Sequence, residues 1–160
     1  RTSFLLGKYF GQILVQLGVM VTITGVIFLS LSRFENVQYL SVLQATLLIF
    51  FETCIITAIT YFFSVNAGSI TTALATFVFF ALGHYSFSSE RSPATKSNPI
   101  TEMIVTIVPN LEVFNLKTFA SYGVTISNRE LGLSLSYALV CTAMFLTLAS
   151  LTFQKKDILT

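Results

Sequence analysis

Charged side chains are scarce in this 160-residue chain: they make up only 10% of it, whereas hydrophobic residues make up 54%. A soluble domain usually carries about 25% charged residues, so most of this chain is expected to lie in lipid. The nine basic and seven acidic residues are scattered and leave a net charge of only +2. This excludes nucleic acid as a partner, because a nucleic-acid surface requires clustered Lys and Arg.

Cysteine and histidine are nearly missing as well, which limits the chemistry available to the chain. Cys54 and Cys141 lie in apolar stretches without a Cys or His at ligand spacing, so we expect small core residues rather than a disulfide framework or a metal site. The single His84 has no companion His or Cys, and we expect an interfacial residue without a catalytic role. The chain also lacks a Gly-rich phosphate loop, a nucleophile elbow and a paired-His zinc motif. We therefore expect no enzymatic activity and no cofactor here, and any energy source has to come from another subunit.

Long apolar runs dominate what is present. Four stretches reach or approach the roughly 20 residues that a bilayer span needs, and they are Tyr9 to Leu31, Tyr39 to Phe63, Ile70 to Tyr85 and Leu131 to Phe153. The run Ser127-Asn128-Arg129-Glu130 before the last stretch has the pattern of a capping box and predicts a helix start near Asn128. The sequence thus predicts an all-α integral membrane protein with four transmembrane helices in one domain over residues 1–160. Because the chain begins at Arg1 with neither an initiator Met nor a signal-peptide pattern, we interpret it as N-terminally incomplete.

The segment from Ser86 to Ile126 has a different character from the four spans. Asn98 and Pro99 favour a helix start and Pro109 marks an end, so this helix would be too short to cross a bilayer. A second short helix is predicted from Phe114 to Tyr122. We expect a re-entrant or surface-lying segment, which is tolerated at membrane depth only where protein or a water-filled cavity shelters it.

Small residues recur along one face of the first span and one face of the fourth. Such faces allow close helix contact in lipid, where the hydrophobic drive for association is weak. We expect packing within the chain, with contact to another subunit as the alternative. The residues are Gly7, Gly11, Gly18 and Gly25 in the first span, and Gly132, Ser136, Ala143, Thr147 and Ser150 in the fourth.

The second span carries hydroxyl side chains and one acid. The hydroxyls could bond to a neighbouring helix or line a polar path, and they belong to Thr46, Thr53, Thr57, Thr60 and Ser64. Glu52 lies near the middle of the span, where an acid costs about 2.5 to 3.5 kcal/mol on insertion scales. It is either a carboxylate that carries protons or contacts substrate, or a residue that fixes helix packing against Thr22, Thr24 or Gln16. Of the two, packing is favoured.

Three segments resemble the type-2 permeases of ATP-binding-cassette (ABC) exporters. The first, Arg1 to Gly11, is similar to the stretch that leads into the third span of that family. The second, Pro109-Asn110-Leu111-Glu112-Val113-Phe114-Asn115, is similar to a Pro-Asn-Leu-Glu-x-Phe-Asn segment between the fifth and sixth spans. The third, Phe153 to Ile158, resembles the charged cytoplasmic tail that ends these proteins.

The resemblance implies a topology. The four predicted spans would be the third to sixth of six, both ends would lie in the cytoplasm, and residues 86–126 would be extracytoplasmic. The count of basic residues does not decide the orientation, because four would lie inside and five outside. The protein would be a multi-pass protein of a bacterial cytoplasmic (inner) membrane.

The resemblance also implies partners and residue roles. The chain would pair with a second permease copy or a close homologue and with ATPase subunits that bind ATP and Mg²⁺. The ATPase-facing residues would be Arg1, Lys8, Asn66, Gly68, Lys155 and Lys156. The third predicted span would help to line the path, and the path candidates are Thr76, Phe77 and Phe80, together with Glu52. The extracytoplasmic gate or partner segment would hold Pro109, Asn110 and Phe114.

Two other functions remain open at this point. One is a membrane scaffold that transmits ATPase motion to an extracytoplasmic partner protein bound on residues 86–126, without transport. The other is a secondary carrier driven through Glu52.

Overall fold

In a computed structural model, the described residues of the chain are 2–34, 38–90, 108–115, 122 and 124–156. This part of the chain is all-helical, which confirms the predicted fold class at that level. It contains four α-helices and one short 3₁₀ helix, and no strand. The helices are α1 (Thr2–Leu31), α2 (Tyr39–Asn66), α3 (Ser69–Glu90) and α6 (Asn128–Lys156), and the 3₁₀ helix is η2 (Glu112–Phe114).

Three of the helices are long and apolar enough to cross a membrane: Ser3–Leu31, Tyr39–Asn66 and Asn128–Gln154. The apolar part of α3, Ser69–His84, is shorter, so its membrane crossing stays a prediction. Helix α1 begins at Thr2 rather than at Tyr9, and α3 continues to Glu90 rather than ending at Tyr85. Helix α6 begins at Asn128, as the sequence pattern predicts.

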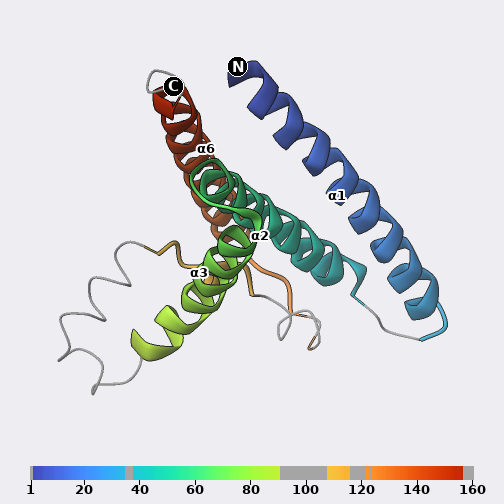
Figure 1. The fold of residues 1–160 in the computed structure, drawn as a ribbon. Helices are drawn as coiled ribbons and strands as arrows, with labels where there is room; N and C mark the ends of the chain where they lie inside the picture. Colours follow the sequence, from blue (N-terminus) through green and yellow to red (C-terminus); the bar gives the residue numbers. More distant parts are fainter. Residues whose placement is uncertain (1, 35–37, 91–107, 116–121, 123, 157–160) are drawn as a thin grey trace.

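Helix α2 is the centre of the fold, since α1, α3, α6 and η2 all contact it (Figure 1). Helix α1 runs antiparallel to α2. The Tyr9 hydroxyl donates to the Cys54 carbonyl at 3.2 Å, and Phe28 meets Tyr39 at a ring-centroid distance of 5.4 Å. Helix α1 thus contacts α2 near both of its ends, and it does so with one of its faces.

Helix α6 runs parallel to α2 and forms the most extensive helix–helix contact in the described structure. Near its start, the Gln44 side chain holds Ile126 by two hydrogen bonds, of 3.0 and 3.3 Å. Near the other end, the rings of Phe62 and Phe145 meet at 6.2 Å. As a result, α1 begins and α6 ends at the same end of the bundle (Figure 1).

The segment 108–115 packs as irregular backbone against the helices rather than standing away from them. Val108, Leu111 and Phe114 are buried. The Asn110 N–H donates to the Tyr137 hydroxyl at 2.8 Å, and the Leu111 N–H donates to the Gly83 carbonyl at 3.2 Å. Neighbouring helices shelter these backbone polar groups, as segments of this kind require at membrane depth.

The two short helices expected between Pro99 and Tyr122 fall mostly outside the described residues. Near Phe114 the structure has the 3₁₀ helix Glu112–Phe114, and most of the second short helix expected from Phe114 to Tyr122 lies outside the described residues. The Asn110 Oδ1 accepts the Glu112 N–H at 3.0 Å. This Asx-type bond stabilises a tight turn directly before the 3₁₀ helix.

The small-residue faces do not pack within the described chain. A side chain added at any of Gly7, Gly11, Gly18, Gly25 or Gly132 would meet nothing within 4 Å, and Ser136 is exposed. At about 100° per residue, the glycines of α1 lie opposite the face that carries Leu5 and Tyr9, which are buried. No described helix therefore packs against these positions, and both packing within the protein and contact with another subunit stay predictions.

Candidate functional site

An ionisable pair lies between α2 and α3. The His84 Nε2 is 3.3 Å from the Glu52 Oε1, and Glu52 is only 6% exposed. The other ring nitrogen, Nδ1, lies 3.2 Å from the Phe80 carbonyl oxygen, and the rings of Phe80 and His84 lie 4.6 Å apart with their planes tilted by 49°. The protein therefore places a carboxyl and an imidazole together inside an apolar helix pair.

The geometry constrains where the protons of this pair lie. Because a carbonyl oxygen can only accept, Nδ1 is assigned as the donor to Phe80. A second proton then lies between Nε2 and Oε1, either as an imidazolium beside a carboxylate or as a neutral imidazole beside a carboxylic acid. In both forms the pair is neutral overall, which lowers the cost of burying it in an apolar environment.

The sequence-based expectations for both residues need correction. Glu52 faces α3 and not α1: the hydroxyls of Thr22 and Thr24 donate to carbonyls of their own helix, and Gln16 donates to Thr57. His84 is not a lone interfacial residue, because it pairs with Glu52. One sequence signal was available, since Glu52 and His84 lie at about equal distances along the chain from the Ala67-Gly68 turn. An antiparallel helical hairpin brings such residues to the same level.

Polar side chains continue along the same interface toward the turn. Residues at four-residue spacing form one row on each helix: Glu52, Ile56, Thr60 and Ser64 on α2 face Thr72, Thr76, Phe80 and His84 on α3. We call this interface the α2/α3 seam. Close to the turn the seam borders a cavity of about 290 Å³, lined by Thr60, Ser64, Ala67, Ser69, Thr72 and Ala73.

Two hydroxyls of the seam have no hydrogen-bond partner within the described part of the chain. They are the buried Oγ1 atoms of Thr72 and Thr76, and Thr72 is only 6% exposed. A buried hydroxyl without a partner is rare in native proteins and needs an explanation, such as a water, an ion or a ligand. The seam thus has the Glu52–His84 pair at one end and a polar cavity at the other, and two of its hydroxyl groups lack a hydrogen-bond partner within the described residues.

The hydroxyl side chains of α2 do not bond across helices as donors. Each donates to a carbonyl three or four residues earlier in α2, at 2.7 to 3.0 Å, and they are Thr46, Thr53, Thr57, Thr60 and Ser64. Thr57 also accepts a bond from Gln16 at 3.0 Å. Because their hydrogens are already donated within α2, these hydroxyl groups can act toward other molecules mainly as hydrogen-bond acceptors.

The structure brings three of the four path candidates together. Glu52, Thr76 and Phe80 all lie on the seam. Phe77 is different, because its side chain is 67% exposed. The gate candidates Pro109, Asn110 and Phe114 lie beside Gly83 and Tyr137, at the Glu52–His84 end of the seam and at the level of the middle of α2.

The candidates for ATPase contact gather at the other end, as far as they are described. Lys8, Asn66 and Gly68 are exposed there, and the Asn66 Nδ2 donates to the Phe62 carbonyl at 2.8 Å. Helix α6 reaches Lys156 at the same end. Arg1 and the side chains of Lys155 and Lys156 lie outside the described residues.

The described residues contain no group of three or more His, Cys, Asp or Glu side chains that could hold a metal ion. Cys54 and Cys141 are buried core residues, as predicted. The fold and the long apolar helices define an all-helical protein of the membrane class. Comparisons with protein-family models, curated proteins and solved structures give no match to the chain.

Proposed function

We propose that this chain is the membrane-spanning permease part of an ABC exporter. It moves a substrate outward by alternating access, and a separate ATPase subunit binds ATP and Mg²⁺ and drives the cycle. The spans would be α1, α2, α3 and α6, equivalent to the third to sixth spans of a six-span permease. A second permease copy or a close homologue completes the path.

The observation that carries the transport proposal is the Glu52–His84 pair inside the α2/α3 seam. Ionisable residues within membrane helices are costly, and they mark paths for substrates or ions more often than lipid-facing surfaces. The unsatisfied hydroxyls of Thr72 and Thr76 continue the polar character toward the cavity beside Ser64. A polar solute crossing this region meets a proton-binding pair and further hydrogen-bonding groups.

The arrangement of α3 supports a fourth span. Its apolar part, Ser69–His84, is about 24 Å long at about 1.5 Å per residue, against about 30 Å for the hydrocarbon core. It returns from the Ala67-Gly68 turn along α2, and segment 108–115 covers its far end. Protein shelter at that end, or local thinning of the bilayer, accommodates the difference in length.

The assignment to ABC exporters rests on the resemblance of three segments, and one of them has a consistent position. The segment Pro109 to Asn115 packs against α3 and α6 at the end of the seam farthest from the start of α1. A buried segment at this place can close the outer exit of the path and move aside when the helices shift. Lys8, Asn66 and Gly68 lie at the opposite end, where an ATPase would dock.

The test is purification of the protein from its native membrane in a mild detergent. We expect an ATPase with a phosphate-binding loop to copurify, and ATP to be required for export from inside-out vesicles. Purification without any such ATPase, combined with transport that needs no ATP, contradicts the proposal.

A proton-driven secondary carrier is the second candidate, and the pairing of Glu52 with His84 favours it specifically, because both side chains bind protons. In proteoliposomes without ATP, such a carrier transports substrate when a proton gradient is imposed and stops when an uncoupler is added. Transport with ATP that survives the uncoupler separates the exporter from the carrier.

A further inference from the structure

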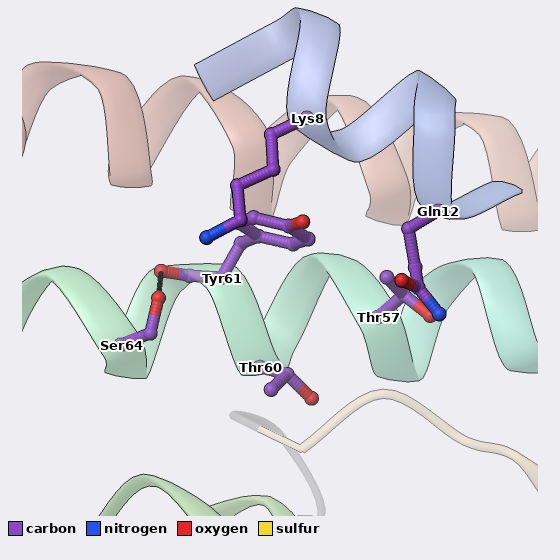
Figure 2. Close-up of a pocket in the computed structure, with 6 residues that line it drawn as sticks. All are labelled: Lys8, Gln12, Thr57, Thr60, Tyr61 and Ser64. Atoms are coloured by element: carbon purple, nitrogen blue, oxygen red, sulfur yellow. Dashed lines mark hydrogen bonds between the residues drawn. The ribbon is translucent and has the colours of Figure 1, made fainter. Parts of the chain in front are cut away.

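A second cavity lies between α1 and α2, and it shares the lining residues Thr60 and Ser64 with the seam cavity. It has a volume of about 390 Å³ and is lined by Lys8, Gln12, Thr57, Thr60, Tyr61 and Ser64. Figure 2 shows the Lys8 side chain reaching from α1 to α2, with its ammonium group toward Ser64, while Gln12 points toward Thr57. Every lining side chain carries a polar group, which is unusual between two apolar helices.

We propose that this cavity binds the headgroup of an anionic phospholipid that carries hydroxyl groups, such as phosphatidylglycerol. The assignment is independent of the proposed transport function, and it gives Lys8 a role other than contact with an ATPase.

The positive charge of Lys8 in the cavity favours an anionic ligand. Lys8 is the only charged lining residue, and among the described residues it takes part in no ion pair. An ammonium group binds a phosphate as a point charge with three donors. The amide of Gln12 and the phenol of Tyr61 supply further donors beside it. A ligand with a single negative charge neutralises the positive charge of Lys8.

The hydroxyl groups of Thr60 and Ser64 on α2 favour a ligand that also carries hydrogen-bond donors. The hydrogens of Thr60 and Ser64 are already donated, at 2.8 Å to Ile56 and at 3.0 Å to Tyr61, so their lone pairs remain for the cavity. The glycerol hydroxyls of a headgroup supply donors of this kind, whereas inorganic phosphate at neutral pH brings mainly acceptors.

The order of residues along α1 matches a lipid rather than a soluble anion. Lys8 lies directly before the apolar stretch of α1, at the level where lysines of membrane helices extend to the headgroups. On the same face, at about 100° per residue, follow Gln12 and then Val15 and Val19, which are 62% and 53% exposed. A headgroup in the cavity thus continues into a surface that acyl chains can cover.

The test uses the purified protein, with any subunit that remains bound, after delipidation in detergent. Native mass spectrometry measures the binding of dioleoylphosphatidylglycerol. Replacement Lys8→Met keeps the apolar stem and removes the charge, and we expect about 10-fold weaker binding or more. The matched control is Arg33→Gln, which removes an exposed charge near the other end of α1 and should leave binding unchanged. Equal binding by the two variants overturns the site.

Two further probes separate the possible ligands. Phosphatidylethanol has the same charge but no hydroxyl group, and we expect the wild-type protein to prefer phosphatidylglycerol by about 3-fold to 10-fold. The replacement Ser64→Ala should reduce this preference. A wild-type protein without preference overturns the assignment of the hydroxyl groups. Inorganic phosphate that displaces the lipid at similar concentration overturns the lipid as the ligand.

Discussion

Leu111 lies directly against Gly83. The Leu111 N–H donates to the Gly83 carbonyl at 3.2 Å, and a Cβ atom added to Gly83 would lie 2.8 Å from the Leu111 side chain and 3.0 Å from the Pro109 carbonyl oxygen. Only a residue without a side chain lets the irregular segment 108–115 approach α3 this closely. The contact fixes that segment beside His84, at one end of the α2/α3 seam.

Replacement Gly83→Ala should therefore lower the free energy of unfolding by about 1 to 3 kcal/mol, because the backbone at Pro109 cannot move away as a side chain can. Thermal unfolding in detergent measures the change. The control is Gly25→Ala, where nothing lies within 4 Å and helix propensity favours alanine by about 1 kcal/mol. Equal effects of the two replacements contradict the close contact.

The Glu52–His84 pair predicts a coupling that a double-mutant cycle can measure. Glu52→Gln and His84→Asn should each destabilise the protein, and the double variant should lose less than the sum. For groups in direct contact, the expected coupling free energy is about 0.5 to 3 kcal/mol. Arg129→Gln combined with Glu52→Gln serves as the control, because Arg129 is exposed at the start of α6. Additive losses for Glu52 and His84 show that the pair does not form.

Gln44 predicts a local effect on the start of α6. Its side chain accepts from the Ile126 N–H at 3.0 Å and donates to the Ile126 carbonyl at 3.3 Å. Gln44→Leu leaves both backbone groups without their partner, at a cost of about 1 to 3 kcal/mol. Hydrogen exchange at the Ile126 amide should become faster, whereas Gln38→Leu, at an exposed position, should leave it unchanged. Unaltered exchange in Gln44→Leu means that another group protects this amide.

Thiol labelling tests whether α3 crosses the membrane. In a background with Cys54→Ala and Cys141→Ala, single cysteines replace Tyr122, which is 80% exposed, or Gly68 in the turn before α3. We expect an impermeant maleimide to label Tyr122→Cys in intact cells and Gly68→Cys only after the cells are opened. Labelling of both from one side means that α3 does not cross. Labelling in the reverse order inverts the orientation.

The helices could be predicted from the sequence because lipid imposes a simple length rule. Runs without charge, such as Tyr9 to Leu31, reach the required length, and the pattern before Asn128 marks a helix start. Helix–helix contacts follow no rule of this kind, since lipid tails are as apolar as Leu or Phe side chains. The glycines of α1 illustrate the difficulty: their spacing predicts a packing face, and the structure has the opposite face against α2.

The candidate site was predicted only in part for a similar reason. Glu52 is conspicuous in the sequence because an acid is costly in a membrane helix, and this holds whatever lies next to it. Its partner depends on how far α3 turns back along α2, and this is set by the turn at Ala67-Gly68 and by ring contacts such as Phe63 with Phe79 at 5.2 Å. His84 could have been found by treating the two helices as a hairpin. The open hydroxyls of Thr72 and Thr76 could not, because only the packed structure shows which groups remain unpaired.

The parallel contact of α2 with α6 has a consequence for biosynthesis. Helix α2 ends at Asn66 and its largest partner begins only at Asn128, so at about 5 to 20 residues per second the ribosome needs about 3 to 12 s to deliver that partner. During this interval the side of α2 that later contacts α6 faces lipid or the insertion machinery. Helix α6 therefore completes the core around α2 only late in synthesis, and a nascent chain halted before Asn128 lacks the helix that forms the most extensive contact with α2.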